Sequence, residues 1–468
     1  MNAAASVLDA APVAYWLEDA VRPEELAPLV SDSAADLVVV GGGYLGLWTA
    51  LLAVTREPGR DVLVLEAETC GHAASGRNGG FCEASLTHGF GNGLARWPEE
   101  LTTLLRLGRE NLDAIEATIG AEKIDCDFVR AGALSVATQT EQVAELAEEQ
   151  AEAAGYGHRL TLLDAAAVRR RVESPTYLGA LLDPDVAILE PARLAWGLRE
   201  ACLRRGVRIH EGTRAVRLAR APHGIVRGRV EVRTEHATVT ARRVALATNA
   251  FRPLLRRLRL MTVPVYDYAL MTEPLSQAQR AAIGWAGREG VGDRTNLFHY
   301  YRTTRDGRIL WGGYDAVYHY ASRQRAAYEG SAPTHEVLAE HFFATFPQLE
   351  GLGFTHRWGG VIDTCTRFTA FHGTAYDGAV AYALGFTGLG VGATRFAAEV
   401  ALDQLAGVET ERTELRMVRE RPLPFPPEPL RWAGIELTRR SLARADANGG
   451  RTNLWLRTMD RMGMGFDS

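Results

Sequence analysis

The chain has 468 residues, of which 47% are hydrophobic and 23% are charged, and its formal net charge is −5. This length allows two domains, and this composition is ordinary for a soluble globular protein. The charge balance gives no basic footprint for a nucleic acid, and no stretch approaches the ~20 apolar residues that a membrane span needs.

Residues 1–33 are predicted to form an extended lead-in, with Tyr15 and Trp16 as its anchors on the body of the protein. The segment has no basic start followed by an apolar run, so no signal peptide is expected. The five cysteines are odd in number and show no CxxC spacing. Neither a disulfide framework nor a zinc site is therefore predicted, no metal is expected, and a reduced, cytoplasmic location is favoured.

The segment 36–66 follows the order of a dinucleotide-binding unit. Its apolar run 36–40 predicts a buried strand, 47–55 predicts a helix, and 61–65 predicts a second strand. Glu66 ends that second strand, where a carboxylate can accept hydrogen bonds from the adenosine ribose.

A G-x-G-x-x-G motif joins the first strand to the helix, with its glycines at Gly41, Gly43 and Gly46. These glycines suit a tight turn, a close approach of the backbone to a pyrophosphate, and close packing of helix on strand. The helix N-terminus adds N–H donors and partial positive charge for the phosphates. Strand, motif, helix, strand and acid in this order predict dinucleotide binding.

The rest of the chain alternates between helical and extended patterns. Helices are predicted at 97–119, 142–154, 190–204, near 335–346 and from 392 to 405, and strands at 132–136, 207–210, 230–233, 237–240, 244–247 and 380–384.

Three features favour FAD over NAD as the dinucleotide. The motif lies near the N-terminus, and a second strand–glycine–helix element at 385–392 lies near the C-terminus. No second complete unit for a nicotinamide cofactor is evident. The second element can direct backbone N–H groups and a helix N-terminus at the pyrimidine edge of a flavin.

The predicted fold class is α/β, with a doubly wound, Rossmann-like FAD-binding domain interleaved with a mixed α+β substrate domain. The FAD-binding domain is assigned to 34–88, 178–252 and 355–408, the substrate domain to 89–177 and 253–354, and a C-terminal extension to 409–468. We expect the ligand where the two domains meet.

Several motifs resemble the FAD-dependent amine and amino-acid oxidases of the D-amino-acid oxidase superfamily, in particular their glycine-oxidase-like and gamma-glutamylputrescine-oxidase-like branch. The resemblance covers about residues 34–405. Its motifs are GGGYLG at 41–46, LVLEA at 63–67, ASGRNGG at 74–80, ATNA at 247–250, TEPL at 272–275, YYR at 300–302, LWGG at 310–313, WGG at 358–360 and GFTGLG at 385–390.

The resemblance implies an oxidase that removes hydride from a carbon bearing an amine, giving an imine, with oxygen as the final acceptor and peroxide as a product. This hydride transfer needs a neutral amine held over flavin N5 and does not need a strong base. The implied cofactor contacts are Gly41, Gly43, Tyr44, Leu45, Gly46, Glu66, Ala67, Ser75, Gly76, Arg77, Asn78, Gly79, Gly80, Thr248, Asn249, Gly385, Gly388, Leu389 and Gly390. Some relatives carry a covalent flavin near the positions of His72 and Cys365, so each is a candidate for such a bond.

The carboxylate-binding arginine of the amino-acid oxidases has no counterpart directly after the WGG motif. Ile362 stands in its place and Asp363 beside it, which favours a substrate with a second ammonium group. Arg367 and Arg302 are alternatives for a displaced carboxylate clamp. A structural ion pair for Asp363 is the other interpretation.

Aromatic residues on predicted strands suit an amine site through cation–π contact. They are Tyr266, Tyr268, His299, Tyr301, Trp311 and Tyr314. The catalytic candidates are His299, as the general acid or base, with Tyr301, Tyr268 and Asp363. Packing in a core is the alternative for each aromatic ring.

The predicted partners are a small-molecule amine and oxygen, with no nucleic acid or membrane, and a homo-oligomer is allowed. Three other functions stay open at this point. An amine dehydrogenase would pass electrons to another acceptor, a flavin monooxygenase would need nicotinamide to reduce its flavin, and a flavin-binding subunit would leave the chemistry to a larger complex.

Overall fold

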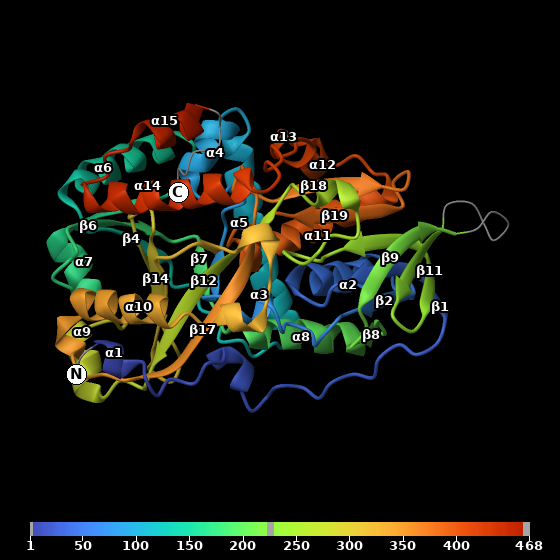
Figure 1. Ribbon diagram of the computed structural model, residues 1–468, viewed down its shortest axis with the longest axis horizontal. Coiled ribbons are helices and arrows are strands. Elements are labelled where there is room, and N and C mark those ends of the chain that lie inside the picture. The colour runs from blue at the N-terminus through green and yellow to red at the C-terminus, as the bar shows by residue number, and fades with distance from the viewer. Residues whose placement is uncertain (1–2, 222–228, 462–468) are drawn as a thin grey trace.

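The protein is described by a computed structural model that covers residues 3–221 and 229–461. Two large sheets lie side by side, and helices cover their outer surfaces (Figure 1). Residues 1–2 of the predicted lead-in and 462–468 of the predicted extension lie outside the described residues. Within the described ranges, no helix is long and apolar enough to cross a membrane.

The helices occur throughout the chain. They are α1 (Ala3–Ser6), α2 (Tyr44–Arg56), α3 (Ala74–Arg77), α4 (Phe90–Arg96), α5 (Leu101–Glu122), α6 (Thr140–Gly155), α7 (Ala165–Arg171), α8 (Pro191–Arg204), α9 (Gln277–Ile283), α10 (Ala332–Thr345), α11 (Gly390–Ala406), α12 (Glu411–Glu414), α13 (Arg416–Arg419), α14 (Leu430–Ala447) and α15 (Leu454–Arg461).

The first sheet has a parallel centre in the order β19-β11-β1-β2-β8. Its strands are β1 (Ser33–Val40), β2 (Val62–Leu65), β8 (Arg208–His210), β9 (Ala215–Arg220), β10 (Val230–Thr234), β11 (Thr238–Leu246), β18 (Phe371–Ala375) and β19 (Val380–Leu384). Strands β9, β10 and β18 add antiparallel pairs at its margins.

Alternation along the parallel strands divides the first core in two. Leu37 and Val39 of β1 pack in the cluster that includes α2, α8 and α11, whereas Val38 and Val40 pack in the cluster on the opposite face. Because both faces are covered, these strands are apolar on both sides, as parallel strands usually are. The predicted α/β class is confirmed.

One predicted interruption is absent from this sheet. The sequence predicts two strands, at 237–240 and 244–247, but β11 is a single strand whose pairing with β1 begins at Val239 and ends at Leu246. Arg242 and Arg243 are polar without being turn formers; both lie within β11, and Arg243 pairs with Leu37 of β1. Arg242 is exposed and Arg243 is partly exposed, so their polarity reflects contact with solvent and not a break in the strand.

A second sheet of nine strands contains the predicted substrate-domain segments. Its members are β4 (Ala133–Ala137), β5 (Thr161–Asp164), β6 (Gly179–Asp183), β12 (Val263–Thr272), β13 (Gly290–Asp293), β14 (His299–Thr303), β15 (Ile309–Gly313), β16 (Val317–Tyr318) and β17 (Phe354–Thr364). Two short strands, β3 (Phe81–Glu83) and β7 (Val186–Ile188), form a separate pair.

Two strands of the second sheet fall inside segments that the predicted boundaries give to the FAD-binding domain. Strand β6 pairs with β4 and β5, and β17 pairs with β12 along ten residue pairs. We assign β17 to the second sheet because its backbone hydrogen bonds are made with β12. The WGG motif at 358–360 therefore lies in the second sheet, paired with β12.

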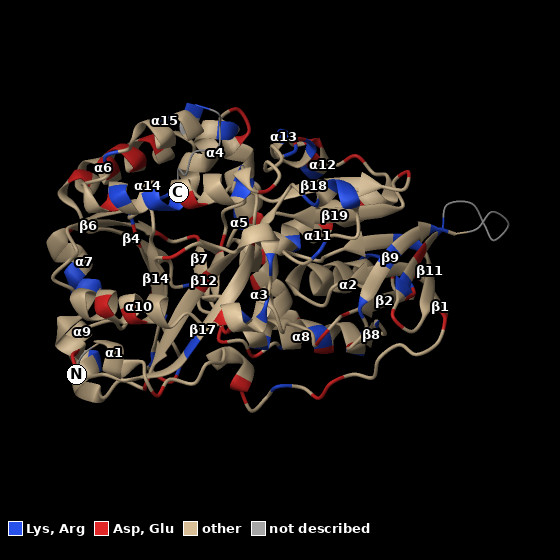
Figure 2. Ribbon diagram, viewed as in Figure 1, with Lys and Arg blue, Asp and Glu red and all other residues tan. Residues whose placement is uncertain are grey.

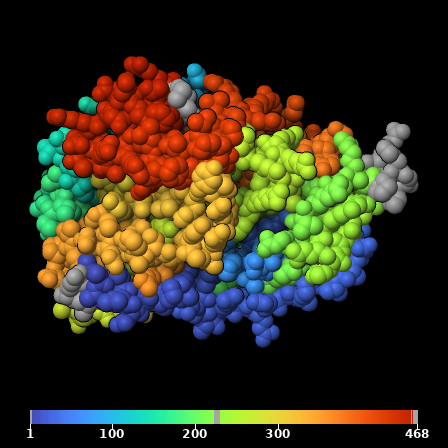
Figure 3. All heavy atoms as spheres, in the orientation of Figure 1, coloured from blue at the N-terminus to red at the C-terminus, as the bar shows by residue number. Residues whose placement is uncertain are grey.

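The C-terminal extension runs back across the molecule to the second sheet. Figure 1 shows α12 and α13 beside the first sheet and α14 and α15 above the strands of the second. In Figure 3 the same helices form a continuous layer over the upper part of the visible face.

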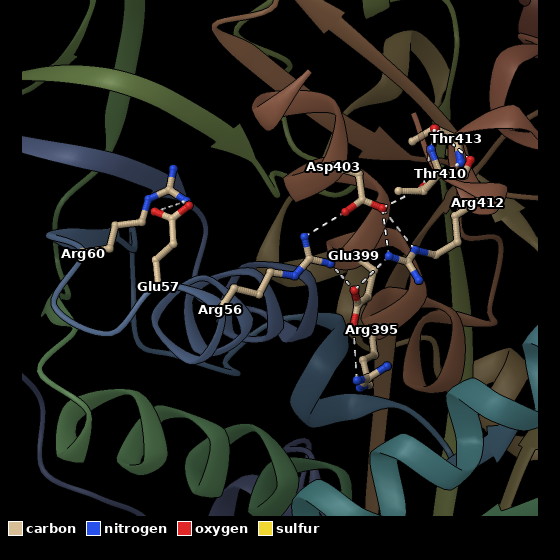
Figure 4. Close-up of polar contacts among 9 residues, drawn as sticks. All are labelled: Arg56, Glu57, Arg60, Arg395, Glu399, Asp403, Thr410, Arg412 and Thr413. Atoms are coloured by element: carbon tan, nitrogen blue, oxygen red, sulfur yellow. Dashed lines mark hydrogen bonds and ion pairs between the residues drawn. The ribbon is translucent and has the colours of Figure 1, made fainter. Parts of the chain in front are cut away.

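An ion-pair network attaches the start of the extension to the first domain (Figure 4). The Asp403 carboxylate accepts bonds from Arg56 Nη1 at 2.8 Å and from Arg412 Nη2 at 2.9 Å, and the Thr410 hydroxyl donates to it at 2.9 Å. Asp403 is on α11, Arg56 ends α2 and Arg412 is on α12. The network therefore ties three helices together around one buried carboxylate.

Replacing Asp403 by alanine should lower the free energy of unfolding by about 2 kcal/mol, because two arginines lose their shared buried partner. Chemical denaturation would measure the change. The control is Glu57→Ala, which removes the nearby pair of Glu57 and Arg60, in which the Glu57 side chain is 65% exposed. That exposed pair should be worth less than about 0.5 kcal/mol, and equal losses in both variants would contradict the prediction.

Candidate active site

A continuous cavity of about 2990 Å³ extends from the carboxyl ends of β1 and β2 to the inner face of the second sheet. This is the edge at which open parallel sheets bind ligands. The predicted location of the ligand, between the two halves of the molecule, coincides with this cavity.

The glycine motif forms the turn between β1 and α2. Gly41 has φ +113°, and a Cβ there would lie 2.4 Å from the Ala247 carbonyl oxygen. A Cβ at Gly46 would lie 1.8 Å from the carbonyl oxygen of Gly41, so only glycine lets α2 pack this closely on the turn. The N-terminus of α2 consequently opens directly into the cavity wall.

Glu66 lies at the end of β2, beside the glycine turn. Its carboxylate accepts the Gly42 N–H at 2.5 Å and the Glu68 N–H at 2.9 Å. Burial raises the pKa of Glu66, while these N–H donors act in the opposite direction. The carboxylate lines the cavity, where further acceptor capacity faces the space for a ribose.

The loop 74–80 crosses the cavity between the two sheets and is held by backbone contacts. The Ser75 hydroxyl accepts the Tyr44 N–H at 2.9 Å, which fixes the loop to the first turn of α2. The Asn78 amide bonds the carbonyl of Ala74 at 2.9 Å and accepts the Gly80 N–H at 2.8 Å. Trp16 of the lead-in donates to the Asn78 carbonyl at 3.0 Å.

Arg302 supports the same loop from behind. Its guanidinium donates to the carbonyls of Gly79 at 2.7 Å and Leu189 at 2.6 Å, and it is fully buried. Burial lowers the pKa of Arg302 to about 10. Its donors are directed at backbone carbonyls, so the geometry does not favour Arg302 as a carboxylate clamp.

Arg367, the other proposed clamp, is also occupied by backbone carbonyls. It donates to Thr369 at 3.1 Å and to Met417 at 2.9 Å, and burial lowers its pKa to about 10. These contacts join the turn after β17 to α13, away from a substrate carboxylate.

Asp363 organises the second glycine-rich element. Its carboxylate accepts the Gly385 N–H at 2.5 Å and the Phe386 N–H at 3.2 Å. Burial raises the pKa of Asp363 to about 7. The side chain is 2% exposed, and its oxygens are directed at the loop that leads into α11. This geometry favours a structural role for Asp363 over the ammonium partner, but through backbone N–H groups and not through the ion pair that the sequence suggested.

The cavity offers backbone N–H groups and open space that fit FAD. Gly388 has φ +94°, and a Cβ there would meet no atom within 4 Å, so the loop leaves room for a ring system. The turn at 41–46 suits the pyrophosphate, Glu66 the ribose, and the loops 74–80 and 385–390 the flavin.

The cavity collects most of the predicted cofactor residues. Gly41, Gly43, Tyr44, Leu45, Glu66, Ala67, Ser75, Arg77, Asn78, Gly79, Thr248, Asn249, Gly388, Leu389 and Gly390 line it. Gly46, Gly76, Gly80 and Gly385 are not among the described lining residues, and they shape the turns behind it.

The three aromatic catalytic candidates lie on the far face of the second sheet. Tyr301 is 1% exposed, stacks on Trp311, and shares a hydrogen bond of 2.7 Å with the Tyr177 hydroxyl. Tyr268 is 2% exposed and donates to the Tyr328 carbonyl at 2.9 Å. These contacts place both rings in the core that α10 covers.

His299 also lies behind the cavity wall. Its Nδ1 pairs with the Asp293 carboxylate at 2.6 Å, and its Nε2 contacts His341 Nδ1 at 2.9 Å. Burial and the nearby His299 lower the pKa of His341 to about 4. His299, Tyr268 and Tyr301 are absent from the described residues that line the cavity, so direct contact with substrate is not favoured for them.

Asp267 and Tyr300 are two of the polar residues through which the second sheet lines the cavity; Asp183, Asp293 and Asp363 are others. The Tyr300 hydroxyl donates to Asp267 Oδ2 at 2.6 Å. The Tyr300 ring lies against the backbone of Gly79, where a Cβ would be 2.7 Å from the ring. Asp267 therefore stands beside the loop that borders the flavin space.

Burial controls the charge of the pair formed by Asp267 and Tyr300. Burial raises the pKa of Asp267 to about 6, although the Tyr300 hydroxyl acts to lower it. Burial and the adjacent Asp267 raise the pKa of Tyr300 well above its usual value. Above about pH 6 the pair is a carboxylate held by a neutral phenol.

The sequence contained a signal for Asp267. Strand alternation puts Tyr266 and Tyr268 on one face, so the intervening carboxylate must point to the other face. A charged residue inside an otherwise apolar strand is unusual without a partner or a function. Aromatic rings suit both a core and an amine site, so the aromatic pattern alone does not specify which face of the strand borders the cavity.

Both candidates for a covalent flavin bond line the cavity, but His72 is the more exposed of the two. Cys365 is fully buried, its thiol donates to the Thr369 carbonyl at 3.2 Å, and burial raises its pKa. His72 is half-buried at the cavity, 3.4 Å from Arg77 Nη2, and burial lowers its pKa. Cys365 is consequently a poor nucleophile.

Cys365→Ser should leave the linkage of the flavin unchanged, because a neutral, bonded thiol does not attack the flavin methyl group. Acid precipitation followed by absorbance of the supernatant measures free flavin. Flavin retained in the wild-type pellet but released from the Cys365→Ser protein would contradict this prediction. His72→Ala is the parallel variant at the accessible position.

The family described as FAD dependent oxidoreductase, DAO, has a sequence profile that matches residues 36–404. The Gamma-glutamylputrescine oxidoreductase of Escherichia coli K12 is 33% identical over 401 residues, which cover 84% of this chain and 88% of that protein. The Probable oxidoreductase OrdL of Haemophilus influenzae Rd is 28% identical over 405 residues, covering 84% of this chain and 88% of that protein.

Solved structures share the fold. The glycine oxidase of Geobacillus kaustophilus has a TM-score of 0.67 at 18% identity, covering 81% of this chain and 96% of that one. The L-proline dehydrogenase of P. horikoshii has a TM-score of 0.67 at 17% identity, covering 81% of this chain and 95% of that one.

Proposed function

Because the chain belongs to the DAO family of FAD-dependent oxidoreductases, we propose that it oxidises the C–N bond of a small-molecule amine to an imine. Water then hydrolyses the imine to a carbonyl compound and a free amine. The relative from E. coli is named for an amine substrate, and this name supports the amine class.

The paired Asp267 and Tyr300 carry the proposal. They are a carboxylate and its donor, 2.6 Å apart, on the cavity wall beside Gly79. An ammonium substrate gains a charge-assisted hydrogen bond there, in a site largely shielded from water. The two buried arginines near the site donate to backbone carbonyls, so a substrate carboxylate is less favoured.

FAD supplies the chemistry of hydride acceptance when it is bound. Asp267 holds the substrate nitrogen and can take up its proton, so that the amine is neutral before the C–H bond breaks. Tyr300 fixes the carboxylate and packs against the loop 74–80. Asp363 holds the loop 385–390 in place. The remaining protein contribution is orientation and exclusion of water.

Oxygen is the acceptor we propose, with peroxide as product. An amine dehydrogenase with a different acceptor is the second candidate, and the L-proline dehydrogenase shows that this fold occurs in a protein so named. Anaerobic mixing of the holoenzyme with an amine panel should bleach the flavin band near ~450 nm, which reports cofactor reduction. Oxygen added next should restore the band and yield peroxide in equal amount.

The panel should include primary amines, diamines, glycine, sarcosine, and D- and L-amino acids. Bleaching only by amines without a carboxylate supports the role of Asp267. Bleaching only by amino acids would contradict it. Bleached flavin that oxygen fails to restore would favour the dehydrogenase, and bleaching by NADPH alone would indicate a monooxygenase.

A further inference from the structure

Helix α14 lies outside the family match, which ends at residue 404, yet it forms part of the cavity wall. Leu430, Ala433 and Leu437 all line the cavity. Their spacing of three and four residues puts them on one face of the helix. The helix thus presents an apolar stripe to the cavity, beside Arg431 and Arg439, which also line it.

Two of these leucines are not covered by protein. Leu430 is 65% exposed and Leu437 is 44% exposed. Leu442, further along the same helix, is 5% exposed and packs with Leu297 and Ala445. The helix is therefore anchored by its C-terminal half, while the apolar face of its N-terminal half borders open space.

Contacts at the start of α14 place this face beside the proposed amine site. The Tyr318 hydroxyl donates to Glu428 at 2.6 Å, and Arg431 donates to the Ser322 hydroxyl at 3.0 Å. Tyr318 on β16 pairs with Val265 on β12, two residues before Asp267. Val265 also pairs with Ile362, and both line the cavity.

A second contact fixes the middle of the helix to the same region. Arg439, two residues after Leu437, donates to the Asp315 carboxylate at 3.0 Å. Asp315 is close enough to Asp267 to raise its pKa. The helix is thereby tied to the cavity wall on both sides of the leucines.

We propose that α14 is the roof of the substrate pocket and that it selects amines with an apolar substituent. The ammonium end would bind Asp267. The substituent would lie between Val265 and Ile362 on the sheet and Leu430 and Leu437 on the helix. This inference rests on the proposed function and adds the substrate class: a primary or secondary amine bearing an alkyl or arylalkyl group.

Two acids elsewhere in the cavity, Asp183 and Glu83, offer a weaker site for a second ammonium group. Asp183 is already 3.4 Å from His158. Burial, with Asp183 nearby, raises the pKa of Glu83 to about 7, which favours its neutral form near that pH. A diamine thus gains less from these two acids than an apolar chain gains from α14.

The test uses the holoenzyme with n-alkylamines of increasing length and α,ω-diamines of matching length. Each methylene buried against the helix should raise kcat/KM of the alkylamines by up to roughly fourfold. The diamines should be poorer substrates at every length. Values of kcat/KM that do not change with chain length, or a preference for diamines, would overturn the proposal.

Leu437→Glu puts a carboxylate on the roof and should reduce the alkylamine preference at least tenfold while improving the diamines. The matched control is Leu454→Glu, at a leucine 76% exposed on α15 and outside the described cavity lining. Equal effects of both variants would overturn the proposal. If Leu437→Glu fails to fold, the wild-type chain-length series decides.

Amines with no hydrogen on the carbon that bears nitrogen separate this inference from the proposed function. Such tertiary-alkyl amines cannot be dehydrogenated, so their dissociation constants, read from perturbation of the flavin spectrum, report binding alone. Affinity that grows with chain length supports the apolar roof even if no amine bleaches the flavin. Affinity independent of length overturns it even if amines are oxidised.

Discussion

Asp267→Asn is expected to reduce kcat/KM for amine substrates by about 100-fold, the equivalent of about 3 kcal/mol, with FAD still bound. The variant keeps the shape of the side chain and removes the charge that pairs with the ammonium group. Asp267 contacts Tyr300 and not the nucleotide loops, so flavin content should be normal. Steady-state kinetics and the ratio of flavin to protein absorbance provide the measurement.

The pH profile gives a second readout of Asp267. Since its pKa is raised to about 6, the carboxylate protonates as the pH falls through that value, and kcat/KM should fall with it. Tyr300→Phe removes a donor that lowers the pKa of Asp267, so this limb should move to higher pH. A wild-type profile without an acidic limb, or Asp267→Asn with normal kinetics, would contradict the assignment.

Asp363→Ala is expected to release most of the FAD and to reduce stability by about 3 kcal/mol. The alanine leaves the N–H groups of Gly385 and Phe386 buried without an acceptor, and the loop that leads into α11 loses its support. Asp363→Asn keeps one acceptor oxygen and should retain more flavin. Thermal denaturation and flavin content of the purified variants test both statements.

The sign of the pH effect on Asp363 follows from its raised pKa. A carboxyl group whose folded pKa exceeds its unfolded value stabilises the fold at low pH, and this contribution is lost as the pH rises through about 7. Asp363→Asn has no ionisable group at this position, so its stability shows no such pH-dependent loss. The stability of the wild type relative to Asp363→Asn should therefore decrease from pH 5 to pH 8, and an increase would contradict the burial of this carboxyl.

The fold was predictable because its signals are local. The unit from β1 to Glu66 combines an apolar run, a glycine turn and an acid in a short stretch, and each has a physical reason for its position. At Gly46 the close packing is against the carbonyl oxygen of Gly41, which lies in the same motif. Such contacts are encoded in adjacent residues and need no knowledge of the rest of the chain.

The substrate side depends on contacts between distant segments. Asp267 becomes a site residue only because Tyr300 and Gly79 lie beside it, and Tyr268 becomes a core residue only because of the loop that carries Tyr328. Aromatic periodicity does not specify which face of a strand is covered. Likewise, nothing in the residues of α14 indicates that Leu437 faces a cavity until the helix is anchored at Asp315.

The most direct test of the account is anaerobic flavin reduction by an alkylamine, compared with the same amine deuterated on the carbon that bears nitrogen. We expect rapid bleaching of the flavin by the protiated amine, slower bleaching by the deuterated one, and a large loss of rate in Asp267→Asn for both. These results would place C–H cleavage of an amine at the site formed by Asp267 and Tyr300. A flavin that no amine reduces, or reduction unaffected by Asp267→Asn, would contradict the account.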